Sequence, residues 1–289
     1  MNRRKSLKII GSFGLASFLP ASLLGEILNK GCEVCKDAWT KLSKFTARRY
    51  QFRYIEPKAA LPKVFIYGDS ISIGYTEYVR ASLEGNALVY RLHVNGGSSN
   101  DFIARMETLR KAMFQPDLEQ GWDFQWDLIH FNVGLHDLKY IAQGKLDKEN
   151  GKQVTSLDKY ADNLRSIIDY LKSTYPDAKL IFASTTPVPE GEAGRIAGDA
   201  KRYNKAARKV VKKHRDIGYN DLYKFAEPVL EEHAAGPGNV HFNSEGSRLL
   251  GIEVADVIAE AMEIETVPCP SAEVITERAS QYEAKNTSS

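Results

Sequence analysis

Short runs of apolar residues alternate with amphipathic stretches through the middle of the chain. Five apolar runs have the length of strands and are predicted as such: residues 63–67, 87–92, 126–132, 178–183 and 219–222. Apolar positions at helical spacing predict the intervening and following helices: residues 73–83, 100–114, 157–172, 199–214 and 244–262. Strand–helix alternation of this kind builds a parallel sheet with helices on both faces. The pattern therefore predicts an α/β fold with a five-stranded parallel sheet.

The same pattern divides the 289 residues into four parts. Residues 61–264 hold the alternating elements and are predicted to form one domain, which is long enough to bury a proper core. Residues 1–25 are an apolar leading segment and residues 26–60 are a basic lead-in. Residues 265–289 are polar and are expected to form a flexible tail.

The leading segment has the pattern of an export signal. The run Arg3-Arg4-Lys5 precedes an apolar stretch, residues 9–24, that glycine and proline interrupt too often for a good membrane span. The charged start loosely resembles a twin-arginine signal. We therefore expect a periplasmic or secreted protein, with the segment either cleaved or kept as a membrane anchor. An ordinary N-terminal helix is the alternative.

The charges of the chain are unevenly divided. The net charge is +2, but residues 1–60 contain 12 Lys/Arg and 4 Asp/Glu, whereas the remaining residues contain 27 and 33. The positive excess therefore belongs to the N-terminal arm. A mildly acidic domain argues against a nucleic acid partner.

Three cysteines are present: Cys32, Cys35 and Cys269. A Cys-x-x-Cys spacing such as that of Cys32 and Cys35 can serve redox chemistry, a metal or a disulfide. No second cysteine pair or nearby histidine completes a zinc set, and the pair lies in the basic arm rather than between a strand and a helix of the domain. We therefore expect a disulfide or an incidental pair.

Polar motifs follow the first three predicted strands, where sites form in parallel sheets. Ser70, in a Gly-Asp-Ser turn, opens a helix whose N-terminal N–H groups stabilise developing negative charge. Gly97, in Asn-Gly-Gly-Ser-Ser, allows a backbone N–H to approach an anionic oxygen closely. His136, in Gly-Leu-His-Asp, can donate an N–H or titrate near neutral pH. Each motif alone is more typical of an ordinary turn or surface loop than of a site.

A serine nucleophile also needs a base, and histidine is the usual one. His241, in Gly-Asn-Val-His-Phe, is the histidine that lies in a loop directly before the last helix and can return to the sheet. The other histidines lie in predicted strands or among charged helix residues.

The order and spacing of these four motifs, from about Lys63 to Met262, resemble the GDSL-type esterases and lipases, also called SGNH hydrolases. The resemblance implies a flavodoxin-like three-layer α/β/α domain that needs no metal or organic cofactor. It implies Ser70 as nucleophile, His241 as general base, and an oxyanion hole made by the N–H groups of Ser70 and Gly97 and the ring of His136. Three further residues are expected to support these groups: Asp69, Asp137 and Asn239.

The chain departs from the usual family pattern at two positions. His136 stands where the third motif usually has Asn, and a neutral imidazole can still donate one hydrogen bond to an oxyanion. Gly238 stands where the last motif usually has Asp, three residues before His241. The base would then act in a Ser–His dyad, be oriented by a backbone carbonyl, or be supported by another carboxylate. Losing a triad carboxylate costs up to ~10⁴-fold in rate. The sequences of residues 130–139 and 185–189 resemble an exported bacterial branch of the family with both features.

These motifs predict ester hydrolysis through an acyl-enzyme on Ser70. An acyl group on a sugar, as in an acetylated polysaccharide, is the expected substrate, because the chain has an export pattern and no long apolar lid segment. A lipid or short-chain esterase, an acyl transferase, and a carbohydrate-binding protein that has lost catalysis are the alternatives. The loop from Pro187 to Asp199, with Glu192 and Arg195, is expected to line the mouth of the site.

Overall fold

A computed structural model describes residues 33–114, 118 and 121–287 of the chain. The predicted export segment, residues 1–25, and Cys32 of the Cys-x-x-Cys pair lie outside the described residues. Within the part that is described, no helix is long and apolar enough to cross a membrane.

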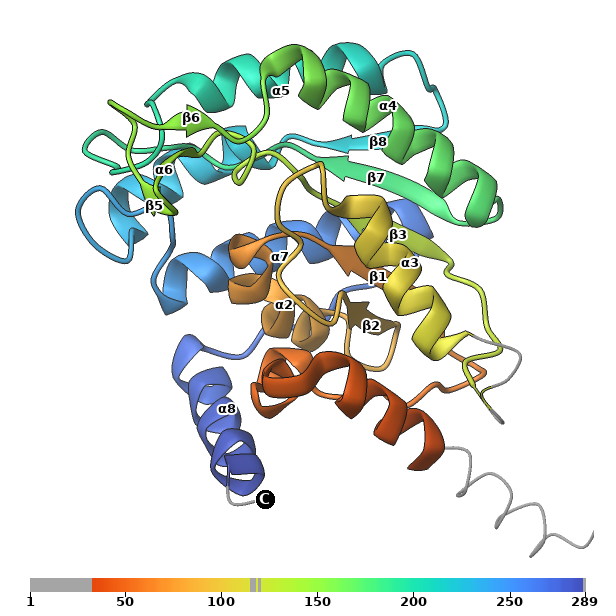
Figure 1. The fold of residues 1–289 in the computed structure, drawn as a ribbon. Helices are drawn as coiled ribbons and strands as arrows, with labels where there is room; N and C mark the ends of the chain where they lie inside the picture. Colours follow the sequence, from red (N-terminus) through yellow and green to blue (C-terminus); the bar gives the residue numbers. More distant parts are fainter. Residues whose placement is uncertain (1–32, 115–117, 119–120, 288–289) are drawn as a thin grey trace, which may run out of the picture.

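A sheet of five parallel strands forms the centre of the molecule (Figure 1). In spatial order the strands are β2 (Leu88–Arg91), β1 (Lys63–Tyr67), β3 (Leu128–Phe131), β7 (Lys179–Ala183) and β8 (Ile217–Asn220). All of β3 and nearly all of β1 are buried, as expected for parallel strands covered on both faces. The predicted α/β fold and five-stranded parallel sheet are confirmed, although the last strand begins two residues earlier than expected.

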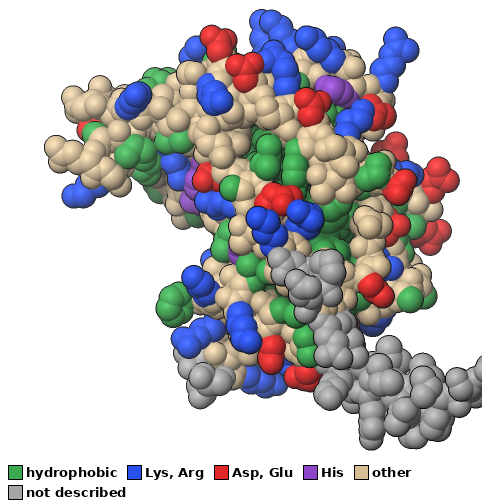
Figure 2. All heavy atoms as spheres, turned by 45° about the vertical axis from the view of Figure 1, so that its right-hand side comes forward, with side chains coloured by type: hydrophobic (Ala, Val, Ile, Leu, Met, Phe, Trp, Pro, Cys, Tyr) green, Lys and Arg blue, Asp and Glu red, His purple; other side chains and the backbone are tan. Residues whose placement is uncertain are grey.

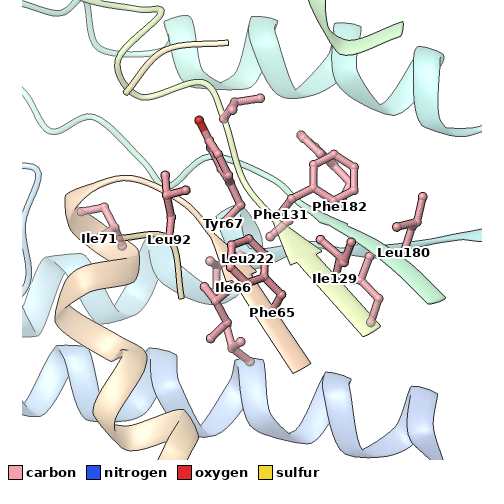
Figure 3. Close-up of a cluster of buried hydrophobic side chains, with 14 of the residues drawn as sticks. Phe65, Ile66, Tyr67, Ile71, Leu92, Ile129, Phe131, Leu180, Phe182 and Leu222 are labelled. Atoms are coloured by element: carbon pink, nitrogen blue, oxygen red, sulfur yellow. The ribbon is translucent and has the colours of Figure 1, made fainter. Parts of the chain in front are cut away.

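Aromatic side chains fill the space beside the central strands. Phe65, Phe131 and Phe182, from three neighbouring strands, are fully buried. The rings of Phe131 and Phe182 meet edge to face with centroids 5.5 Å apart, and Figure 3 shows them together above the sheet. Such pairs contribute roughly 0.5–1.5 kcal/mol beyond the area they bury. This core holds the strand ends in fixed positions.

Helices cover both faces of the sheet and complete three layers (Figure 1). On one face, α2 (Ser70–Ser82) packs against α7 (Ser244–Met262). On the other face lie α3 (Phe102–Met113), α4 (Leu157–Thr174) and α5 (Asp199–Val211). Helix α4 shows why the sequence folds this way: Ser156 caps its first turn, and its apolar stripe, which includes Leu164 and Leu171, is completely buried.

Two features of the domain are not among the predicted elements. Helix α6 (Leu222–His233) connects β8 to α7 and contains Pro228. A small antiparallel sheet of β4 (Tyr140–Ala142), β5 (Lys145–Leu146) and β6 (Lys152–Gln153) interrupts the connection between β3 and α4. Strands of two or three partly exposed residues leave no alternation in the sequence that a periodicity search can detect.

The basic lead-in packs against the domain. Residues 33–43 form a helix, followed by the 3₁₀ turns η1 (Lys44–Arg48) and η2 (Tyr50–Phe52). Trp39 and Phe52 are 3% and 1% exposed and belong to the same folded body, and the Trp39 indole N–H donates to the Phe52 carbonyl over 2.7 Å. The described part of the lead-in, residues 33–60, thus belongs to the folded domain.

The C-terminal tail was expected to be flexible, and that expectation is wrong for most of its length. Residues Ala272–Thr287 form helix α8, which lies against α7, η1 and η2. Ala272 and Ile275 are buried, and Tyr282 packs on Tyr50 with ring centroids 5.4 Å apart. A few apolar residues at helical spacing in an otherwise polar segment are enough, because other parts of the fold provide the surfaces that they cover: Ile275 packs on α2, and Tyr282 packs on the lead-in.

Candidate active site

Ser70 lies at the sharp turn from β1 into α2. Asp69 is the N-cap of α2: its Oδ1 accepts the Ile71 backbone N–H over 2.9 Å. Ser70 is the first residue of the helix, so its own N–H is one of those that lack a partner within the helix. A side chain at Gly68 would lie 2.8 Å from Ser72, so this turn requires glycine. The turn exposes a hydroxyl beside a positive helix end.

His241 reaches Ser70 from the loop between α6 and α7. Its Nε2 lies 2.8 Å from Ser70 Oγ, although the two residues are 171 positions apart in sequence. The loop is fixed by an isolated bridge between Ala234 and Phe242 and by the hydrogen bond from Ala235 N–H to the His241 carbonyl. The structure therefore brings together the two residues predicted as nucleophile and base.

Asn239 holds the other side of the imidazole. Its Oδ1 lies 2.8 Å from His241 Nδ1 and 3.0 Å from the His241 backbone N. A carboxamide oxygen only accepts hydrogen bonds, so Nδ1 carries the proton and Nε2 is left to accept the Ser70 hydroxyl. The group that orients the base is therefore the amide of Asn239, one of the three residues expected to support the site. It is neither a carboxylate nor a backbone carbonyl.

Gly238, where the family usually has Asp, cannot easily carry a side chain here. Its φ is +64°, in the left-handed region, and a Cβ would lie 2.8 Å from the carbonyl oxygen of Gly191. The loop that contains Gly191 thus closes the usual position of the carboxylate. The close approach of this loop is therefore compatible with Gly at position 238 and not with Asp.

The imidazole of His241, the predicted base, is neutral at neutral pH. Burial is the main cause that lowers the pKa of the His241 imidazole; Lys139 and Arg195 lower it further, and Asp69 opposes them. Only a neutral imidazole can accept the serine proton. This electrostatic setting therefore favours the form that a general base needs.

His136 belongs to the same charged surroundings. Burial lowers its pKa to about 4, with Lys139 and Arg195 adding to the effect and Asp69 again opposing it. Lys139 Nζ lies 3.1 Å from Nδ1 and 3.5 Å from Nε2 of the ring. An ammonium group can only donate, so the closer contact favours the tautomer with an N–H at Nε2. The neutral ring thus keeps one donor for an oxyanion.

The third predicted oxyanion donor is already engaged. The Gly97 N–H donates to Asn95 Oδ1 over 2.9 Å. Gly97 has φ +69°, and a Cβ there would meet Asp101 and Arg105 within 3 Å, so the position requires glycine. The bond orients the Asn95 amide, and no described residue accepts a hydrogen bond from its NH₂ group. Because Asn95 lines the pocket at Ser70, this NH₂ group is a donor that the sequence analysis did not assign.

Asp137 has a supporting position away from the serine. It is buried and accepts hydrogen bonds from the Ser99 hydroxyl and backbone N–H, over 2.5 and 3.0 Å. Burial raises the pKa of this carboxyl to about 6, and the bonds from Ser99 limit the rise. Asp137 therefore ties the loop after β3 to the loop after β2, which carries Gly97.

The loop from Pro187 to Asp199 differs from its expected role. Glu192 and Arg195 are about 5% exposed and form an ion pair of 2.7 Å, while Arg195 Nε donates to the Leu135 carbonyl. None of the described residues lining the pocket at Ser70 comes from this loop. Its charged residues thus brace the loop of His136 instead of lining the mouth.

The pocket beside the serine has a volume of about 390 Å³. Its lining combines the predicted site with the lead-in: Thr46, Arg49, Gln51, Phe52, Ser70, Ile73, Gly74, Asn95 and His241. Figure 2 shows an indentation at the left-hand edge of the molecule, where histidine side chains lie among charged ones of both signs. The lead-in residues of this lining were not among the predicted site residues, because they belong to no motif and no periodic pattern that the sequence analysis could use.

The sequence profile of the GDSL-like lipase/acylhydrolase family matches residues 66–249, which is more than half of the chain. The protein therefore belongs to this family, the SGNH hydrolases, as its motifs indicated. No curated protein matches the sequence.

Solved structures of this class share the fold. A lipase/acylhydrolase from Enterococcus faecalis is 18% identical, with a TM-score of 0.52 over 73% of this chain and 100% of its own. An acetylxylan esterase from Geobacillus stearothermophilus is 20% identical, with a TM-score of 0.51 over 68% of this chain and 94% of its own. A second acetyl xylan esterase is also 20% identical, with a TM-score of 0.51 over 69% of this chain and 98% of its own.

Proposed function

We propose that the protein is an exported serine esterase that removes an acyl group, an O-acetyl group in particular, from a carbohydrate. The observation that carries this proposal is the chain of contacts from Ser70 Oγ through His241 to Asn239, at 2.8 Å each. Such a relay activates a hydroxyl that is otherwise a weak nucleophile.

The reaction has two halves. His241 Nε2 takes the Ser70 proton as Oγ bonds to the ester carbonyl carbon, and the carbonyl oxygen becomes an oxyanion. When the C–O bond to the sugar breaks, His241 returns the proton to the leaving sugar hydroxyl. Water then attacks the acyl-enzyme with His241 as base, which releases the acid and restores Ser70.

We assign the oxyanion to three N–H donors, of which those of Ser70 and Asn95 come from residues that line the pocket and that of His136 does not. The Ser70 N–H lies at the start of α2, and His136 keeps an N–H at Nε2. The NH₂ group of Asn95 is the third candidate, in place of the Gly97 N–H, which donates to Oδ1 of the same side chain. Removing one such donor from a hydrolase typically costs about 10²–10³-fold in kcat.

Three observations support a carbohydrate ester as the substrate. The pocket has a volume of only about 390 Å³, so it suits a short acyl group better than a long chain. Two neighbours of the fold are named acetylxylan esterases. The leading segment has an export pattern, so the substrate would lie outside the cytoplasm.

The direct test measures acetate release from 4-nitrophenyl acetate and from acetylated xylan. Ser70→Ala is expected to lose at least about 10³-fold in kcat/KM. Ser173→Ala, which changes an exposed serine of α4, is the matched control and is expected to leave the rate unchanged. Equal rates for Ser70→Ala and the unaltered protein would overturn the proposal.

A further inference from the structure

Residues 43–53 of the lead-in form one wall of the pocket at Ser70 and are called the lead-in segment from this point on. Four of its side chains line that pocket: Thr46, Arg49, Gln51 and Phe52. They share the pocket with Ser70 and His241, which come from the strand-end turn and the last loop of the family domain. The family profile matches only from residue 66 onward, so this wall lies outside the matched part of the chain.

Several contacts hold the lead-in segment in place on the domain. Thr46 Oγ1 donates to the His93 carbonyl over 2.7 Å, which ties the segment to the end of β2. Arg80 donates to the Gln51 carbonyl over 3.0 Å. The buried guanidinium of Arg91 lies 4.4 Å from the centroid of the Phe52 ring. A wall fixed in this way can present a side chain to a substrate without a large loss of entropy on binding.

Arg49 is the one permanently charged residue among those that line the pocket. The other lining residues carry no permanent charge, and burial keeps the His241 imidazole neutral at neutral pH. Among the described residues no carboxylate forms an ion pair with Arg49, whose guanidinium lies 5.7 Å from the Phe52 ring centroid. An unpaired guanidinium presents a planar fork of donors that matches a carboxylate or sulfate.

We infer that Arg49 binds an anionic group of the substrate, so that the preferred substrate is an acylated acidic saccharide. The inference rests on the proposed esterase function and adds the class of sugar to it. Arg49 here is a binding residue: it attracts and orients the sugar, while Ser70 and His241 carry out the reaction.

The test compares three acetylated methyl glycosides: a neutral glucoside, a glucuronoside, and a glucoside 6-sulfate. The unaltered protein is expected to hydrolyse the anionic substrates with a kcat/KM about tenfold higher than that of the glucoside, mainly through a lower KM. Comparing glucuronoside with sulfate shows which anion the pocket prefers. Raising the salt concentration is expected to reduce this preference.

Arg49→Ala is expected to abolish the preference, and Arg49→Lys to keep part of it. The matched control is Arg48→Ala, which removes the same charge from the adjacent residue, exposed and lining a different cavity. It is expected to leave the preference and its salt dependence intact.

The outcomes separate the inference from the function on which it rests. If Ser70-dependent hydrolysis occurs but the unaltered protein shows no preference, or Arg49→Ala keeps it, the anion subsite is overturned and the esterase stands. If none of the three substrates, nor 4-nitrophenyl acetate, is hydrolysed in a Ser70-dependent manner, the proposed function itself fails.

Discussion

At the scale of single residues, the unusual feature is that an amide supports the base. Asn239 fixes the tautomer and direction of the His241 ring through a contact of 2.8 Å. A neutral amide does not stabilise the imidazolium that forms in the transition state as a carboxylate would. The His241 ring is therefore oriented as in a triad, but its protonated form is stabilised less than it would be by a carboxylate.

This arrangement predicts the pH dependence. Because burial lowers the pKa of His241 below its ordinary 6.5, the base is deprotonated above that lowered value, and kcat/KM is lost only as the pH falls through it. The acid limb of the pH–rate profile is thus expected below pH 6.5. Asn239→Asp places a negative charge beside the ring, which raises the pKa and is expected to move this limb up by about one pH unit.

Two further variants distinguish orientation from charge. Asn239→Ala is expected to lower the plateau of kcat/KM about tenfold, since one orienting hydrogen bond is lost. Gln281→Glu adds the same charge as Asn239→Asp on an exposed turn of α8 and is expected to leave the limb where it is. A limb that does not move in Asn239→Asp would show that Asn239 is not next to the working base.

Gly238 gives a second prediction at this scale. Gly238→Asp introduces the residue that the family usually has at this position. It also places a side chain on a backbone with φ +64°, with its Cβ 2.8 Å from the Gly191 carbonyl oxygen. The left-handed backbone alone costs roughly 1–3 kcal/mol, which lowers Tm by several degrees for a domain of this size. We expect lower stability in thermal unfolding and no gain in kcat/KM.

Gly236→Asp is the matched control, because a Cβ at Gly236 meets nothing within 4 Å. It introduces the same side chain two residues away and is expected to leave Tm nearly unchanged. A Gly238→Asp variant that is as stable as this control and more active would contradict the structure of the loop.

At the scale of elements, the buried pair of Glu192 and Arg195 joins two loops of the site. Glu192 also accepts the Gly194 N–H, and Arg195 donates to the Leu135 carbonyl next to His136. Removing one partner leaves a buried charge without compensation, which typically costs about 3–5 kcal/mol. Arg195→Met is therefore expected to lower Tm strongly and to reduce kcat/KM in the molecules that remain folded.

The exposed pair of Arg165 and Asp162 on α4 provides the comparison. Its side chains are about half exposed, so Arg165→Met is expected to cost less than about 1 kcal/mol. Thermal unfolding of both variants measures the difference. Equal shifts would mean that the loop does not depend on the buried pair.

Local patterns in the sequence predicted the regular elements well. The run at residues 63–67 became β1 without change, and α4 and α7 began within a residue of their expected starts, because each carries its own period and cap. The order of motifs also placed Ser70 and His241 at one sheet edge. The small sheet of β4–β6 and helix α8 were not predicted. Their segments contain few apolar residues, and they are held in place by contacts with residues far away in the sequence.

At the scale of the whole molecule, segments from both ends of the chain meet and complete the pocket. The Tyr282 hydroxyl of α8 donates to the Ala47 carbonyl over 3.2 Å, and the Tyr50 N–H donates to Glu283 Oε1 over 3.3 Å, from 233 residues away. No local pattern encodes contacts at such separation, which is why the sequence pattern separates the lead-in from the domain and predicts a flexible tail. Helix α8 thus braces the wall that carries Arg49.

This bracing predicts that a change in α8 opens the lead-in segment while the sheet stays folded. Tyr282→Ala removes the ring that packs on Tyr50 and the hydroxyl that bonds Ala47, and a loss of about 1.4 kcal/mol raises the open population tenfold. Trypsin cleavage after Arg48 and Arg49 follows that population when reclosing is fast. We expect cleavage there to accelerate about tenfold, with circular dichroism unchanged. Gln281→Ala, exposed on the same helix, is expected to cleave at the original rate, and equal rates for both variants would mean that α8 does not hold the pocket wall.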